Sequence, residues 1–410
     1  MSALATLAEY AATHSVDPGL REKLALHVAD GCVALQAGRR TREGHDLAGF
    51  FGEEAAAANA ALIRHTEIDD IDRVSGVTAC AIVLPAALEG APIARRLVDA
   101  LAVGYELAAR RAEALGGARL LVQGIWPSYV AAPFGAAAAA GRMLGLSPEQ
   151  MCNALALALA QTAHRVGRSG GRWLLFAQAV RAGCLAARAA AQGYTGDRGL
   201  YADEIEAATL GLGRSSVIHR VSIKPHCSAK QALAAIHGLK MLLERGVAAL
   251  DIERVDVAVP SAYAGMLDRE PPTAGRLASI VNARYQLALA ALRPAALDDV
   301  ARDPVQWSAE IEDWAARVHI AAAPDLDSHY PERWPARVTA HVGGERHEIL
   351  VLDSPGDPAL AFGLPEIEDK AQRMLGEGGR QTVHLALHAC EDDAALARLR
   401  KEIEAGATRA

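Results

Sequence analysis

Ile223-Lys224-Pro225-His226-Cys227 separates two parts of the chain that differ in their sequence patterns. Pro225 disfavours helical backbone at the residue before it, so Lys224 is predicted to be extended. A helix is predicted to begin near Ser228, because leucine and isoleucine then recur at helical spacing. Backbone N–H groups at a helix N-terminus favour anions, so a lysine beside them is suited to hold a carboxylate. The plainer alternative is a solvated surface lysine.

The sequence before this segment is rich in alanine and has the apolar period of helices. Ser147, Pro148 and Gln150 form a helix start signal, in which serine caps the N-terminus and proline occupies the first turn. Glycine and alanine dominate 135–141, which permits close packing of helices. The predicted helices are 20–35, 53–63, 94–114, 131–144, 148–161 and 174–192.

The sequence after the segment mixes strand and helix signals. Alternating valines over 255–259 end at Pro260 and predict a strand. Two further alternating runs, 337–342 and 346–352, flank a glycine pair and predict a β-hairpin. Helices are predicted at 279–292, 308–317, 364–375 and 394–403.

These patterns predict a mostly α protein with a smaller α/β domain. The large helical domain is predicted to span 1–219 and to be rejoined by the tail at 354–410. The smaller α/β domain is predicted to span 220–353.

Composition excludes several classes of protein. The chain has 42 basic and 49 acidic residues, a net charge of −7 and no basic block, so a nucleic-acid partner is not expected. No apolar run reaches about 18 residues without a charge or break, so a membrane partner is not expected either. The first residues lack the basic start and apolar run of a signal peptide. Six scattered cysteines without a CxxC pair fit reduced thiols in the cytoplasm.

Three short motifs are weak. Gly167-Arg168-Ser169-Gly170-Gly171 matches the G-x-S-x-G nucleophile pattern, but a helix rather than a strand is predicted before it. A mobile glycine loop is the preferred interpretation. Gly211-Leu212-Gly213 lacks the third glycine of a dinucleotide site. The 14 histidines include no HxH or HExxH pair, so no metal site is predicted.

An acidic cluster, Glu67, Asp69, Asp70 and Asp72, follows the helix predicted at 53–63. Asp69 and Asp72 share a face if that helix continues. Crowded carboxylates can shift one another's pKa and act as general acid or base. The alternative is a solvated loop at a helix end.

Several separated blocks, in the right order and covering nearly the whole chain, resemble the MmgE/PrpD family. That family includes 2-methylcitrate dehydratase, cis-aconitate decarboxylase and iminodisuccinate epimerase. Block 59–70 looks like the family's NGxxAHxxDxDD, and block 224–236 looks like its KPYPCC…HAAI. The other similar blocks are 100–107 (AxxxGYE), 127–146 (FGAAAAAxxLLGL), 285–291 (YxxAxAL), 334–338 (WPARV) and 355–358 (PxGDP).

The resemblance implies a large helical domain plus a smaller α/β domain, with the active site between them, in a homodimer. It implies no cofactor and no metal. Characterised members remove a proton from the carbon next to a carboxylate and then eliminate water, lose CO2 or reprotonate.

The chain departs from the family pattern where proton transfer is expected. Glu67 stands in place of the catalytic aspartate, and Thr78 and Trp126 replace histidines. Histidine titrates near neutrality, whereas threonine and tryptophan do not. Trp126 brings a π-face that can pack on an apolar group or a cation. The usual proton-transfer residues are therefore rebuilt, which argues against 2-methylcitrate dehydratase or cis-aconitate decarboxylase in the strict sense.

The anion-binding residues are better retained. Arg172 replaces a lysine; it can hold a carboxylate through two hydrogen bonds but cannot act as a base. Leu175 and Leu233 replace two further histidines, and His226 stands where the family usually has an aromatic residue. The residues that still match the pattern are Lys224, Tyr285, Asp69 and Asp70.

The resulting hypothesis is a cofactor-independent lyase or isomerase that removes a proton next to the carboxylate of a small substrate. Lys224, Tyr285, His226, Glu67 and Asp69 are the catalytic candidates. An epimerase or a pathway-specific enzyme of secondary metabolism is an alternative within the family, and a non-catalytic binding protein is an alternative outside it. The substrate-binding candidates are Arg172, Trp126, Thr78 and Asp70.

Overall fold

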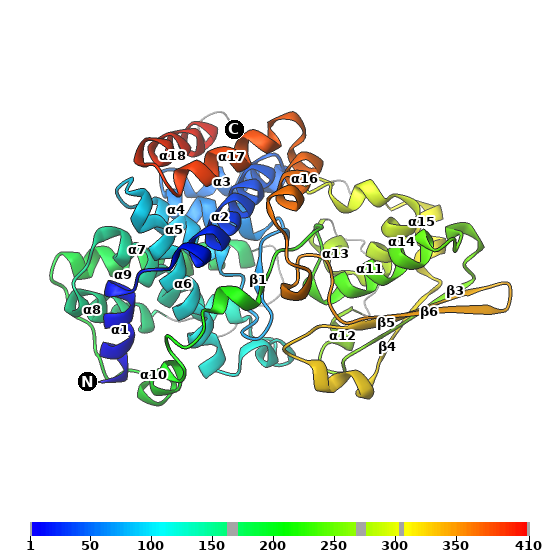
Figure 1. The fold of residues 1–410 in the computed structure, drawn as a ribbon, viewed down its shortest axis with the longest axis horizontal. Helices are drawn as coiled ribbons and strands as arrows, with labels where there is room; N and C mark the ends of the chain where they lie inside the picture. The colour runs from blue at the N-terminus through cyan, green and yellow to red at the C-terminus, as the bar shows by residue number, and fades with distance from the viewer. Residues whose placement is uncertain (1, 162–170, 268–275, 303–306, 408–410) are drawn as a thin grey trace. The chain divides into compact units, whose positions relative to one another are not determined.

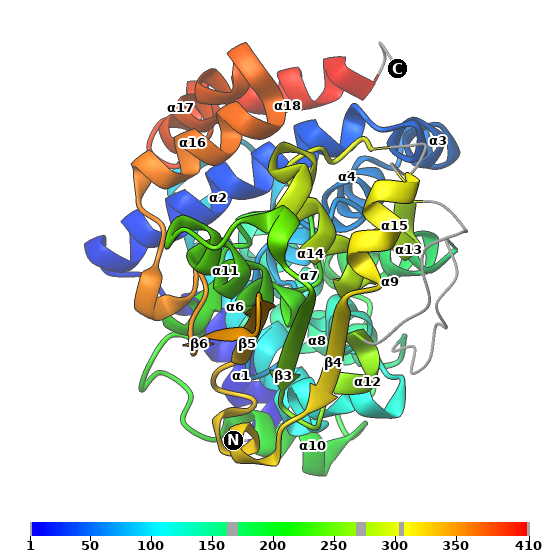
Figure 2. The same ribbon diagram turned by 90° about the vertical axis from the view of Figure 1, so that its right-hand side faces the viewer.

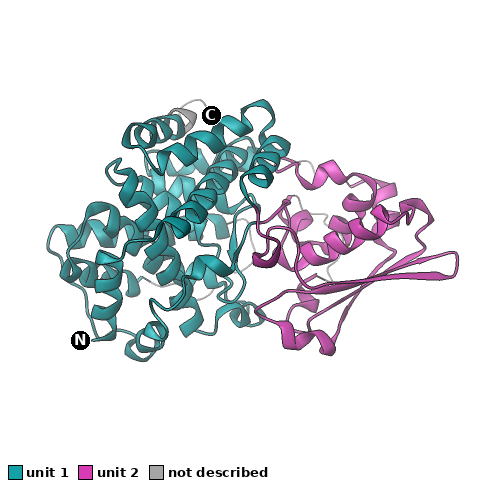
Figure 3. Ribbon diagram, in the orientation of Figure 1, with its two compact units in different colours: residues 1–223, 363–410 teal, residues 224–362 magenta. Residues whose placement is uncertain are grey.

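The computed structural model describes residues 2–161, 171–267, 276–302 and 307–407. The chain divides into two compact units (Figure 3). Unit 1 comprises Met1–Ile223 and Gly363–Ala410, and unit 2 comprises Lys224–Phe362. Each unit has its own buried core.

Unit 1 is helical (Figure 1). A short antiparallel pair joins β1 (Ile71–Asp72) to β2 (Val221–Ser222). Its helices in the first part of the chain are α1 (Ala3–Thr13), α2 (Pro18–Arg39), α3 (Arg42–Phe51), α4 (Ala55–Arg64), α5 (Cys80–Leu88), α6 (Ala94–Ala114), α7 (Pro127–Leu144), α8 (Pro148–Leu159), α9 (Arg172–Ala191) and α10 (Ala202–Thr209). The C-terminal segment adds α16 (Leu364–Leu375), α17 (Gly379–Ala389) and α18 (Asp393–Ala407).

Small residues allow the central helices of unit 1 to approach closely. A Cβ atom on Gly135 of α7 would lie 2.7 Å from the Cβ of Ala108 on α6. A Cβ on Gly183 of α9 would lie 2.3 Å from the carbonyl oxygen of Pro133 on α7. These separations are far below van der Waals contact, so larger side chains would force the helices apart. The many alanine and glycine residues therefore allow the helices of this core to pack closely.

A buried lysine ties the C-terminal segment to the rest of unit 1. The Nζ atom of Lys370, on α16, lies 2.5 Å from Oδ1 of Asp30 on α2. It also donates to the carbonyl oxygen of Ile68, at 2.8 Å. Lys370 thereby fixes the backbone of the turn that follows α4.

Unit 2 contains a four-stranded mixed sheet in the order β4-β3-β5-β6 (Figure 2). β3 runs parallel to β4 and antiparallel to β5, and β5 and β6 form a hairpin. Helix α11 (Lys230–Glu244) packs against β5 and β6. The strands are β3 (Arg254–Val259), β4 (Val318–Ala322), β5 (Ala336–Val342) and β6 (Glu345–Val351), and the other helices are α12 (Ala264–Leu267), α13 (Arg276–Val281), α14 (Ala283–Leu292) and α15 (Ala309–Ala315).

The predicted fold class, mostly α with a smaller α/β part, is confirmed. The strand and hairpin predicted from alternating residues are present. The single helix predicted at 279–292 is wrong, because it is divided into α13 and α14. Asn282 causes the break, since its side chain accepts a hydrogen bond from the backbone N–H of Tyr285 at 2.9 Å and caps α14.

Helix α9 is the one helix in the described part of the chain that is long and apolar enough to cross a membrane. Half of its apolar window is buried inside the protein. A core helix of a globular protein meets the same test of length and composition, so this single helix is weak evidence for a membrane span.

Candidate active site

The acidic cluster lies in a turn after α4 rather than on a helix. α4 ends at Arg64, so the helix does not continue and Asp69 and Asp72 do not share a helical face. Glu67 has a φ of 58°, a left-handed conformation that is uncommon for a residue with a side chain. Such conformations persist where the surroundings impose them and are enriched at functional sites.

Two arginines hold the carboxylates of this turn. Arg64 donates to Oε1 of Glu67 at 3.0 Å and to Oδ1 of Asp69 at 3.1 Å. Arg172 donates to the same oxygen of Glu67 at 3.3 Å. Burial alone would lower the pKa of Arg64, but the charges of Asp69 and Glu67 outweigh it and raise that pKa. Sequence reasoning missed Arg64, although its spacing of three residues from Glu67 was a usable signal.

Arg172, the first residue of α9, lies over two aromatic rings. Its guanidinium carbon is 4.1 Å from the centre of the Trp173 ring and 5.1 Å from that of Trp126. The side chain is buried, and its Nε makes no hydrogen bond to any residue that the structure describes. Burial lowers the pKa of Arg172, and the charge of Glu67 only partly opposes this. The guanidinium of Arg172 is therefore held in one orientation, and Glu67 balances its positive charge only in part.

The other two binding candidates in unit 1 are engaged with their neighbours. Oγ1 of Thr78 lies 3.0 Å from Oγ of Ser128. Asp70 accepts hydrogen bonds from the Cys80 backbone N–H at 3.0 Å and from the Tyr105 hydroxyl at 2.5 Å. Its Oδ2 also lies 2.8 Å from Nδ1 of His27. These bonds join α2, α5 and α6, so a substrate contact to Asp70 would compete with them.

The lysine segment begins unit 2. Lys224 is 1% exposed, so it is not a solvated surface lysine. Two residues later, Nδ1 of His226 lies 2.7 Å from Oδ1 of Asp298. The His226 side chain is 12% exposed and that of Asp298 is 11% exposed. A carboxylate at this distance orients an imidazole and fixes which nitrogen carries the proton.

The backbone around this pair is held in register. The N–H of Cys227 donates to the carbonyl oxygen of Leu297 at 3.0 Å. Buried Arg302 donates to the carbonyl oxygens of Cys227 at 3.0 Å and Ala296 at 2.9 Å. These bonds align the lysine segment with the turn that carries Asp298. Sequence reasoning missed Asp298, which follows His226 by 72 positions and has no local signal.

Tyr285 lies on α14, in the same unit as Lys224 and His226, and is fully buried. Its ring centre is 5.6 Å from that of Trp307. In unit 1, direct contacts group Glu67, Asp69, Arg172 and Trp126.

The glycine motif at 167–171 lies outside the described residues except for Gly171. No three His, Cys, Asp or Glu side chains within the described ranges are placed to hold a metal ion.

Comparisons with known proteins agree with this architecture. The model of the MmgE/PrpD N-terminal domain matches residues 44–210, and that of the MmgE/PrpD C-terminal domain matches residues 226–393. A stretch of 179 residues is 31% identical to the cis-aconitate decarboxylase of Aspergillus terreus, covering 39% of this chain and 36% of that protein. Cis-aconitate decarboxylase-like protein oryM of Aspergillus oryzae (strain ATCC 42149 / RIB 40) is 31% identical over 123 residues, 27% of this chain and 26% of that protein. The chain therefore spans 36% and 26% of the lengths of these two curated relatives.

Proposed function

The chain belongs to the MmgE/PrpD family, and on that premise we propose that it is a lyase or isomerase acting on a small carboxylate-bearing substrate. The proposed step is removal of a proton from the carbon next to the carboxylate, without a cofactor. The observation that carries this proposal is the 2.7 Å contact between His226 and Asp298.

His226 is assigned as the base because the carboxylate of Asp298 orients its imidazole. When Nδ1–H donates to Asp298, the lone pair of the imidazole lies on Nε2, which is then the nitrogen that accepts a proton. The carboxylate also stabilises the imidazolium that forms. The acidic candidates are less suited, since Glu67 and Asp69 are both held by arginines in unit 1.

Lys224 is assigned to the substrate carboxylate, and Arg172 is the carboxylate-binding candidate within unit 1. Both are buried, and charged donors in such surroundings stabilise developing negative charge far better than in water.

The proton passes from the substrate carbon to Nε2 of His226, and the electron pair left on carbon delocalises into the carboxylate as an enolate-like anion. Protonation of the opposite face by a second donor gives an epimer, and loss of a neighbouring hydroxyl, protonated by the imidazolium so that it leaves as water, gives an alkene. In a decarboxylation, the imidazolium instead protonates the carbanion left when CO2 departs. Tyr285 is assigned as a second proton donor, because a phenol donates a hydrogen bond at neutral pH.

Proton NMR in D2O tests this proposal. The protein is incubated with citrate, 2-methylcitrate, cis-aconitate and iminodisuccinate, and exchange or turnover is followed. We expect deuterium incorporation next to a carboxylate, and we expect it to vanish in His226→Gln. Exchange that persists undiminished in His226→Gln would remove His226 from the mechanism.

Asp298→Asn is expected to lower kcat/KM by about 10- to 100-fold, the range found when a group that orients a histidine is removed. Asparagine keeps the shape but can donate to Nδ1, which favours the tautomer with the proton on Nε2. The pH profile of kcat/KM should move as well, whereas a loss of folding alone would not move it.

A measurement without substrate separates the pair from the reaction. In protein labelled with 15N-histidine, the His226 signals are identified by their loss in His226→Gln. We expect the Nδ1–H tautomer in the wild type and a change of tautomer in Asp298→Asn. An unchanged tautomer would refute the role of Asp298, even if turnover fell.

A further inference from the structure

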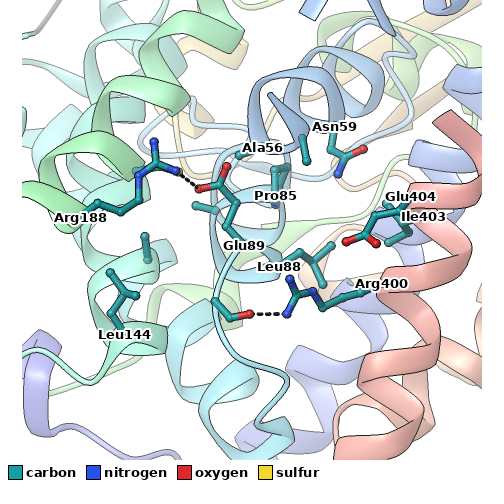
Figure 4. A pocket seen from close by; sticks show the side chains of 15 residues that line it. Ala56, Asn59, Pro85, Leu88, Glu89, Leu144, Arg188, Arg400, Ile403 and Glu404 are labelled. Atoms are coloured by element: carbon teal, nitrogen blue, oxygen red, sulfur yellow. Dashed lines mark hydrogen bonds and ion pairs between the residues drawn. The ribbon is translucent and has the colours of Figure 1, made fainter. Parts of the chain in front are cut away.

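A hollow of about 220 Å³ lies within unit 1, away from the residues assigned above (Figure 4). It is bounded by α4, α5, α7, α9 and α18. Cys184, which lines it, follows Arg172 by twelve residues on α9, a rise of about 18 Å along the helix. The hollow is therefore separate from Arg172 and its aromatic neighbours.

The walls of the hollow are small and apolar. Ala56 of α4, Pro85 and Ala86 of α5, and Ala140 of α7 supply short side chains, and Leu144 lies at its edge, 42% exposed. Short side chains on these three helices leave space that larger ones would fill. A compact apolar group would replace water against these walls favourably.

A polarised amide faces this space. The Oδ1 atom of Asn59 accepts a hydrogen bond from Arg39 at 3.3 Å. Its Nδ2 points toward the hollow in Figure 4. Arg39 is 9% exposed, and its Nε and NH1 make no hydrogen bond within the described ranges. A cation bound to the amide oxygen strengthens the amide as a donor, so Asn59 is prepared for an acceptor.

The charges around the hollow favour a single negative charge. Arg188 is paired with Glu89 at 3.2 Å, and Arg400 donates to the carbonyl oxygen of Gly90. Glu404 is the second acidic side chain of the lining. The two arginines and two glutamates of the lining balance one another, and Arg39, which lies behind Asn59 and outside the lining, adds one buried positive charge.

The buried thiol in the lining is unsuited to covalent chemistry. Burial raises the pKa of Cys184, and the neighbouring charge of Glu89 raises it further. The thiolate, which is the reactive form, is therefore disfavoured. The lining is therefore suited to non-covalent binding.

We propose that this hollow is a binding site for a small organic monoanion, a carboxylate on a compact apolar body. The carboxylate accepts from Nδ2 of Asn59 and lies near Arg400, and the apolar body contacts the alanines and Pro85. The site shares α9 with Arg172, but its ligand binding does not depend on the proposed reaction.

Calorimetric titration with pivalate tests the proposal, with pivalamide as the uncharged probe of the same shape. We expect pivalate to bind and pivalamide to bind at least about tenfold more weakly, because a hydrogen bond to a charged group is stronger. Arg400→Gln should weaken pivalate binding by about tenfold. Equal binding of both probes, or no binding of pivalate at millimolar concentrations, would overturn the proposal.

Two further variants locate the bound probe. Ala55 is exposed at the start of α4 and lines the hollow, so Ala55→Leu should obstruct it without loss of folding. Ala207→Leu adds the same bulk at an exposed position of α10 and should leave binding unchanged. Lys224→Ala should also leave it unchanged. Binding that is lost in Lys224→Ala and kept in Ala55→Leu would assign the probe to the proposed active site and refute a site in the hollow.

Discussion

Lys224→Ala is expected to lower kcat by about 10²- to 10³-fold, the cost of removing one donor that stabilises an oxyanion. Lys224 is 1% exposed, so no water readily replaces its charge. The loss should appear mainly in kcat, since the enolate-like anion carries more charge on its oxygen atoms than the substrate does. Initial rates of turnover, measured over a range of concentrations of a substrate identified by NMR, give kcat and KM.

Two variants serve as controls for this prediction. Lys224→Arg retains the charge but alters its geometry, so its rate should lie between those of the wild type and the alanine variant. Lys401→Ala removes an exposed lysine of α18 and should leave the rate unchanged. Equal rates for Lys224→Ala and the wild type would show that this lysine has no part in the reaction.

Lys370→Met is expected to lower the free energy of unfolding by about 3–5 kcal/mol, the range for breaking a buried ion pair by removing one partner. The variant leaves the carboxylate of Asp30 buried without its cation and the carbonyl of Ile68 without its donor. Urea denaturation measures the change, and exposed Lys401→Met should alter stability by no more than about 0.5 kcal/mol. The double variant Lys370→Met/Asp30→Leu should recover much of the loss. If the urea concentration at the midpoint of unfolding is the same for Lys370→Met and the wild type, the buried pair is not a stabilising contact.

The pH dependence of Lys370→Met provides an independent check. Burial raises the pKa of Asp30, and the charge of Lys370 opposes that rise. Without Lys370, the folded state should hold a proton on Asp30 well above the ordinary pKa of about 3.9. A group with a raised folded pKa binds more protons when folded, so stability falls as pH rises from the unfolded pKa toward the folded one. The destabilisation should therefore shrink below about pH 4.

Local patterns predicted much of the fold. The period of apolar residues located α16, and the alternating valines located β3, because in each case one face is buried. Helix α5 was missed because it is buried on all sides and has no apolar period. Strand β4 was missed because its exposed edge position leaves little alternation. Both depend on contacts with residues far away in the sequence.

The candidate site was predictable only where its residues are neighbours in the sequence. Glu67 and Asp69 were found together because they occupy one turn, but their pairing with Arg172 joins segments about a hundred residues apart. The same limit applies to Asp298, whose partner lies in another part of unit 2. The Trp126 ring, expected to pack on an apolar group or a cation, has the guanidinium carbon of Arg172 5.1 Å from its centre. The partner itself could not be chosen from the sequence.

The C-terminal segment, which returns to unit 1 after unit 2, gives synthesis of the chain a definite order. On the ribosome, all of Lys224–Phe362 is made before Lys370 emerges. Until then, Asp30 has no cation and the carbonyl of Ile68 has no donor from α16. In a nascent chain, the turn that contains Glu67 therefore lacks its contact with α16, although all of unit 2 has been made and can fold. Premature termination within unit 2 would leave unit 1 without the helices that complete it, however stable its other helices were.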